Sequence, residues 1–119
     1  MSDHELLALA AKAAGIENLA PPGCAAIVRS DGEGYSCTWN PLGHSRDAFE
    51  LAVDLKLFVD NCGAFSECAG FVGQGDDMRR IGCEELHEHH GGDAYAATRR
   101  AIVRAAAAIA EAGEGAGRG

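Results

Sequence analysis

The side chains of this chain that are best suited to chemistry lie between Cys83 and Asp93. The segment combines a thiol, imidazoles and carboxylates, which are the groups that bind zinc and related metal ions. The candidate ligands are Cys83, His87, His89 and Asp93. The segment has no Cys-x-x-Cys pair and no His-Glu-x-x-His motif, and the adjacent rings of His89 and His90 would point in different directions. We therefore weigh a metal site, which could serve a metal-dependent hydrolase, against a solvated polar loop, and we favour the loop.

Cysteine chemistry is a second possibility. A reactive thiol needs a neighbouring base, and Cys83 with His87 is the only such pair that is close in sequence. The five cysteines are odd in number and irregularly spaced, a usage typical of free thiols in a reducing compartment. We expect no disulfide, and spacing alone does not establish a thiol enzyme.

Three further side chains are candidate contacts for a binding partner. Arg100 and Arg104 are one turn apart in a predicted helix and so share a face, and Trp39 is the only tryptophan. For the two arginines we favour a solvated outer face over a phosphate-binding patch. For Trp39 we favour a plug in the core over a ligand contact, because its predicted neighbours include apolar groups.

The charge balance of the whole chain argues against nucleic acid as a partner. The chain has 119 residues, with 10 Lys and Arg against 18 Asp and Glu, and its net charge of −8 opposes binding to phosphates. No apolar run approaches the roughly 20 residues that span a bilayer, and the N-terminus is acidic where a signal peptide would be basic. We expect a cytoplasmic protein that uses no membrane and no cofactor.

Apolar residues recur at helical spacing in two segments of the first half of the chain. Residues 3–14 follow a capping Ser2 and end at Gly15, which favours the left-handed conformation that closes a helix. Residues 46–55 follow Ser45 as the predicted N-cap. The apolar stripe of this second helix consists of Ala48, Leu51, Ala52 and Leu55.

A third and longer helix is predicted to begin after Asp93, which would cap it. Its expected buried stripe is Tyr95, Thr98, Ile102, Ala105 and Ile109. Residues 113–119 are rich in glycine, and we expect a flexible tail there. A chain of this length can form one core, so we assign a single domain to residues 1–112.

Residues 24–39 predict a β-hairpin around Asp31-Gly32, a dipeptide suited to a two-residue turn. Such a turn would pair Ser30 with Glu33. It would also pair Val28 with Tyr35, Ala26 with Cys37 and Cys24 with Trp39. All the large apolar groups of the hairpin would then share one buried face.

Residues 57–59 and 65–72 predict a second hairpin, in which Gly70 indicates a bulge or an early end of the strand. Residues 73–92 show no period and predict a long loop with at most one short element. The predicted order is α-β-β-α-β-β-α. We therefore expect an α+β fold, an α/β/α sandwich whose antiparallel sheet consists of two hairpins.

Three segments resemble a known family in their order and spacing. They are residues 5–15, then residues 39–42 followed by 47–53, and finally residues 97–106. In these segments the chain is similar to the phage ABA sandwich domain of small bacteriophage and prophage proteins, with NinX-like proteins as looser relatives. The resemblance implies helices on both faces of a β-sheet and a phage accessory gene, and it implies no catalytic motif. The chain departs from the family pattern at residues 43–46, where an acidic run is more usual.

Two functional hypotheses follow from these patterns. The first is a non-enzymatic phage or prophage accessory protein that binds an unknown protein partner, or a second copy of itself, through an incompletely covered sheet face or helix. The alternative is a metal-binding protein or metal-dependent hydrolase that uses the segment from Cys83 to Asp93. We favour the first, because a structural role explains each candidate motif better than a chemical role does.

Overall fold

The computed structural model describes residues 2–73 and 75–117 and has an α+β fold. All strand pairs are antiparallel, which confirms the predicted fold class. The elements are α1 (Asp3–Ala14), β1 (Ile27–Ser30), β2 (Ser36–Trp39), α2 (Ser45–Asp54), β3 (Phe58–Asn61), β4 (Phe65–Val72), β5 (Arg79–Leu86) and α3 (Ala94–Gly117). The strands differ from the expected single sheet of two hairpins, because they form two sheets, β1–β2 and β3–β4–β5.

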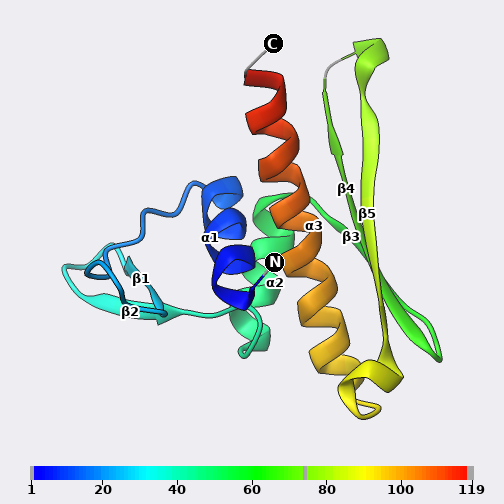
Figure 1. Ribbon diagram of the computed structural model, residues 1–119, viewed down its shortest axis with the longest axis horizontal. Coiled ribbons are helices and arrows are strands. Elements are labelled where there is room, and N and C mark those ends of the chain that lie inside the picture. The colour runs from blue at the N-terminus through cyan, green and yellow to red at the C-terminus, as the bar shows by residue number, and fades with distance from the viewer. Residues whose placement is uncertain (1, 74, 118–119) are drawn as a thin grey trace.

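Helix α3 lies at the centre of the molecule (Figure 1). It packs on β4 and β5 on one side and on α1 and α2 on the other, and the β1–β2 hairpin lies beyond α1. A series of alanines on α3 is fully buried, which allows the helix axis to approach its neighbours closely. The core that surrounds α3 includes Leu6, Leu7, Ile27, Trp39, Leu51, Cys68 and Val103.

The helix ends agree with the predicted caps in two cases out of three. The Ser2 hydroxyl accepts a hydrogen bond from the N–H of Glu5, and the Asp93 carboxylate accepts hydrogen bonds at the start of α3. Helix α2 is different, because Ser45 is its first residue and its N-cap is His44, whose side chain makes no capping hydrogen bond. The Ser45 hydroxyl instead accepts a hydrogen bond from another element, as described below.

The first hairpin forms in the predicted place but in a different register. Ser30 pairs with Ser36 and not with Glu33, so the loop takes up residues 31–35. The Asp31 carboxylate accepts hydrogen bonds from the N–H groups of Glu33 and Tyr35. Asp31 thus stabilises a longer loop than the two-residue turn that its sequence suggested.

The new register turns the opposite face of β1 toward the core while Trp39 of β2 stays buried as predicted, because the pairing is shifted by an odd number of residues. Ile27 now lies opposite Trp39, and both are 1% exposed. Cys37 pairs with Arg29 instead of Ala26 and is exposed. Tyr35, predicted on the buried face, lies in the loop and is 74% exposed. The core therefore receives two large side chains from this hairpin.

The second hairpin is continued by a third strand, β5, in the segment that showed no period. The inward positions of β5 include Cys83, directly opposite the buried Cys68, and the buried Glu85. A carboxylate at a buried position breaks the apolar alternation by which a strand is recognised. The residues after β5 form a short 3₁₀ helix, His87–His90.

Gly70 causes neither a bulge nor an early end, since β4 continues to Val72. A Cβ atom at Gly70 would lie 2.8 Å from the Cδ1 atom of Ile109 and 2.8 Å from the Cδ2 atom of Leu57. The glycine therefore lets α3 and the segment before β3 approach the strand closely.

The stripe predicted for α3 is buried in its middle, at Ile102 and Ala105, but not at its start. Tyr95 is 76% exposed, because nothing in the described part of the chain covers the first turn of α3 on that side. The helix extends to Gly117 and so includes most of the predicted tail, of which residues 118–119 lie outside the described residues. No described helix is long and apolar enough to cross a membrane.

Candidate functional site

Trp39, one of the three predicted partner contacts, is inside the molecule. Its side chain is 1% exposed and belongs to the main core. A partner cannot reach the indole without opening the structure. The structure therefore places Trp39 as a core plug, the interpretation that the sequence favoured.

Arg100 and Arg104 share a face of α3 as predicted, and both are engaged within the chain. Arg100 forms an ion pair with Asp3 at 2.9 Å and lies 3.7 Å from Glu85. Arg104 donates hydrogen bonds to the Glu85 carboxylate and to the backbone oxygen of Glu84. The two guanidinium groups thus connect α3 to α1 and β5, and their charges are balanced by carboxylates.

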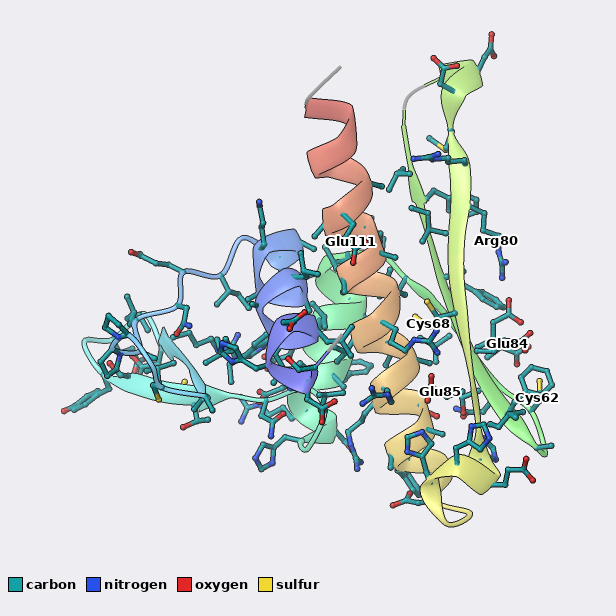
Figure 2. All side chains as sticks on the ribbon, viewed as in Figure 1. Cys62, Cys68, Arg80, Glu84, Glu85 and Glu111 are labelled. Carbon is teal, nitrogen blue, oxygen red and sulfur yellow. The ribbon has the colours of Figure 1, made fainter. Side chains whose placement is uncertain are left out.

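The Glu85 carboxylate is the common partner of these charges. Figure 2 shows that Glu85 points from β5 toward α3, whereas Glu84 points away from it. His90 contributes a third contact, with 2.9 Å between its Nε2 atom and Glu85 Oε1. Burial acts to raise the pKa of Glu85, but hydrogen bonds from His90 and Arg104 and the charges of Arg104 and Arg100 outweigh burial and lower the pKa.

The predicted metal ligands in the 3₁₀ helix and just before α3 are engaged in separate contacts. His87 Nε2 lies 3.0 Å from the Ser66 hydroxyl, Asp93 caps α3, and His89 is exposed beside Glu88. Among residues 2–73 and 75–117, no group of three or more His, Cys, Asp or Glu side chains is arranged to hold a metal ion. The structure therefore does not bring the four predicted ligands together.

Cys83, the fourth predicted ligand, lies opposite Cys68 in the sheet, and both thiols are free. Burial raises the pKa of Cys68 to about 12. Burial also raises the pKa of Cys83, although the charge of Arg104 acts in the opposite direction. At neutral pH both groups are thiols and not thiolates, so neither is an activated nucleophile.

A groove that the sequence analysis did not single out lies between α2, β3 and the first turns of α3. Its volume is about 640 Å³, within the range of small-molecule and side-chain binding sites. We call it the α2–α3 groove. Its apolar and aromatic lining includes Phe49, Val53, Leu57, Val59, Tyr95 and Ile102. Several of these side chains are largely exposed, Phe49 by 69%, Val53 by 57% and Tyr95 by 76%.

Polar side chains form a hydrogen-bonded cluster at the β3 end of this groove. The Ser66 hydroxyl lies 2.8 Å from Asn61 Oδ1, 3.0 Å from His87 Nε2 and 2.8 Å from Thr98 Oγ1. Thr98 Oγ1 also lies 2.6 Å from Asn61 Oδ1 and 2.7 Å from the backbone oxygen of Ala94, and its single proton is donated to one of these two acceptors at a time. Asn61, His87 and Thr98 line the groove, so a bound molecule would meet apolar walls and a polar end.

The contact between Ser66 and His87 has the distance of a serine–base pair. A nucleophilic serine, however, must reach its substrate, and Ser66 is 0% exposed beneath Asn61, His87 and Thr98. The cluster therefore connects β3, β4 and α3, and it presents polar atoms to the groove without presenting a nucleophile.

One signal in the sequence could have located the groove. Phe49 and Val53 are four residues apart and lie off the buried stripe of α2, so this short helix carries apolar side chains on two faces. On α3 the predicted stripe begins at Tyr95 and continues into the core, and its exposed first part lines the groove. An apolar helix face that extends beyond the part covered by the core indicates a binding surface.

No protein-family model, no curated protein and no solved structure matches this chain. The resemblance to the phage ABA sandwich domain thus remains a prediction from the three sequence segments.

Proposed function

We propose that this protein is a non-enzymatic binding module, a phage or prophage accessory protein that holds an apolar segment of a partner protein in the α2–α3 groove. The observation that carries the proposal is the exposed apolar lining of this groove, contributed by a whole face of α2 and the first turns of α3. Aromatic side chains around a hollow are typical of interface anchors. The phage context is supported by the sequence resemblance alone.

A binding role without chemistry is also supported by the groups that could have reacted. The hydroxyl of Ser66 is covered, and burial raises the pKa values of both Cys68 and Cys83. The pocket-lining Asn61 and Thr98 are already hydrogen-bonded to each other. These contacts favour a preformed, rigid receptor surface over a reacting one.

A partner protein is favoured over a second copy of this chain. A second exposed surface with apolar side chains is the outer face of the β3–β4–β5 sheet, which includes Phe71 at 62% exposure. A row of carboxylates crosses that face, because Asp60 lies opposite Glu67 and Glu67 opposite Glu84. Arg80 forms an ion pair with Glu67, so the row has three carboxylates against one cation and stays negative. Two copies packed face to face would bring two such rows together, which is electrostatically unfavourable. We expect a monomer in sedimentation experiments.

The test compares variants inside and outside the groove. Phe49→Ser and Tyr95→Ala remove exposed aromatic rings from the groove, so we expect both variants to fold like the parent and to lose the partner. Phe71→Ser, an equally exposed aromatic residue on the outer sheet face, is the matched control. Each tagged variant is incubated with lysate of the bacterial host, and captured proteins are quantified by mass spectrometry.

We expect one partner to be retained by the parent and by Phe71→Ser and to be lost by both groove variants. Circular dichroism confirms that the folds agree. A partner that is captured equally well by Phe49→Ser and Tyr95→Ala would place the binding site elsewhere and reject the proposal.

A further inference from the structure

Arg99 is a half-buried cation of the α2–α3 groove, and no carboxylate of the described residues lies within ion-pair distance of it. Its Nε atom donates to the backbone oxygen of Leu42 at 2.9 Å, and its Nη1 atom donates to the Ser45 hydroxyl at 3.1 Å. Both acceptors are neutral. By contrast, five other arginines of the described chain lie within 4 Å of a carboxylate, namely Arg29, Arg46, Arg80, Arg100 and Arg104.

The Asp, Glu, Lys and Arg side chains among the described residues that line the groove are all cationic. Lys56 lines the groove at the end of α2, and no carboxylate lies within 4 Å of its ammonium group in the described part of the chain. No Asp or Glu among residues 2–73 and 75–117 lines the groove, although the chain has 18 acidic residues and a net charge of −8. The groove is therefore locally positive on an acidic molecule, which favours an anionic group in its occupant.

The hydrogen bonds of Arg99 also fix its geometry. The contacts to Leu42 and Ser45 use two of the five N–H donors of the guanidinium group and hold its plane in place. The remaining donors form the planar fork that binds a carboxylate with two parallel hydrogen bonds. A preorganised arginine of this kind loses little conformational entropy when it binds.

We infer that the partner segment held in the groove is acidic, and that an Asp or Glu next to its apolar anchors binds Arg99. This inference rests on the proposed function, because it specifies the chemistry of the same partner. A protein segment fits better than a free fatty carboxylate, since Phe49 and Tyr95 are largely exposed and make the groove lining an open apolar surface, not an enclosed pocket.

The probe is a displayed library of random peptides, selected separately on the parent and on variants. The parent should enrich peptides that combine apolar residues with an adjacent Asp or Glu. Arg99→Gln should enrich apolar peptides without the acidic residue, and its affinity for a parent-selected peptide should fall by about tenfold or more. Arg46→Gln is the matched control, because Arg46 lies on α2, is 89% exposed and does not line the groove.

Two further measurements keep the inference testable if Arg99→Gln is unstable. Lys56→Gln changes an exposed side chain and should weaken the acidic peptide by about threefold. The affinity of the parent for that peptide should also decrease as salt is added. An affinity that is unchanged in Lys56→Gln and independent of salt would overturn the inference.

The outcomes separate the inference from the proposed function. Enrichment of neutral or basic peptides that need Phe49 would overturn the acidic partner and leave the groove as a binding site. Failure to enrich any peptide that depends on Phe49 would reject the proposed function itself. Saturable binding of dodecanoate that depends on Arg99, without peptide enrichment, would replace the protein partner by a small carboxylate and so overturn both.

Discussion

Glu85 shows how much a single polar residue can contribute to the arrangement of helices. The residue is 9% exposed, and its carboxylate is contacted by Arg100 and Arg104 of α3 and by His90. Arg100 in turn forms an ion pair with Asp3 at the start of α1. One buried carboxylate therefore fixes the position of α3 relative to β5 and, indirectly, to α1.

We predict that Glu85→Gln lowers the free energy of unfolding by about 2 kcal/mol, because it removes charged hydrogen bonds while leaving the arginines in place. Glu84→Gln is the matched control, since this neighbouring side chain is exposed and faces away from α3. Its effect should stay within about 0.5 kcal/mol. Urea unfolding measures both values, and equal effects of the two substitutions would contradict the role of Glu85.

The ion pairs of Glu85 also predict that the stability of the protein depends on pH. The pKa of Glu85 is lowered in the folded state. Protonation of Glu85 therefore removes ion pairs from the folded state, whereas the unfolded state has no such ion pairs to lose. The contribution of Glu85 to stability is therefore complete above the unfolded-state pKa of about 4.3 and is lost as the pH falls through the lower folded-state value. The difference between parent and Glu85→Gln in unfolding free energy should shrink over that range. A difference that stays constant down to strongly acidic pH would contradict this prediction.

Cys68 provides a second prediction, on thiol reactivity. Its side chain is 0% exposed and burial raises its pKa to about 12, whereas Cys37 is exposed. Iodoacetamide at mildly alkaline pH should therefore alkylate Cys37 readily and leave Cys68 unmodified until the protein unfolds. Mass spectrometry of peptides after timed labelling measures both rates. Comparable rates for the two cysteines in the native protein would disagree with the burial of Cys68.

At the scale of elements, the distance between α3 and β4 depends on Gly70. A methyl group at this position would approach the Cδ1 atom of Ile109, the one atom that a valine at 109 lacks. We predict that Gly70→Ala costs about 1–2 kcal/mol. In the double variant Gly70→Ala, Ile109→Val the cost should be smaller than the sum of the single costs.

The control for this pair is Gly63→Ala, because no atom lies within 4 Å of a Cβ at Gly63. Its effect on the free energy of unfolding should stay within about 0.5 kcal/mol. Additive costs in the double variant, measured by urea unfolding, would show that helix and strand do not meet at this point.

Elements also differ in how far the sequence predicted them. The starts of helices α1 and α3 could be predicted from Ser2 and Asp93, because these side chains cap the adjacent turn and need no distant partner. Strand β5 did not follow, because the buried Glu85 interrupts the apolar pattern and is stabilised by arginines on another element. The register of the first hairpin was wrong for a related reason, since the Asp31 side chain closes a longer loop.

At the scale of the whole molecule, one continuous core connects the two sheets through the helices. Trp39 of β2 and Cys68 of β4 belong to the same buried cluster. We therefore predict that the two sheets unfold together, so that tryptophan fluorescence and the alkylation of Cys68 report the same midpoint in urea. A change in fluorescence at a lower urea concentration than the alkylation of Cys68 would show that the β1–β2 hairpin unfolds independently.

The sequence by itself determined the fold class, the three helices and the plug role favoured for Trp39, because caps and apolar periods act between neighbouring residues. It located neither the α2–α3 groove nor the cation within it. Arg99 contacts Leu42 across 57 positions, and Ser66 contacts Thr98 across 32. Only the tertiary structure decides such contacts, since they form when α3 packs between α2 and the sheet, and that packing determines which apolar side chains remain exposed.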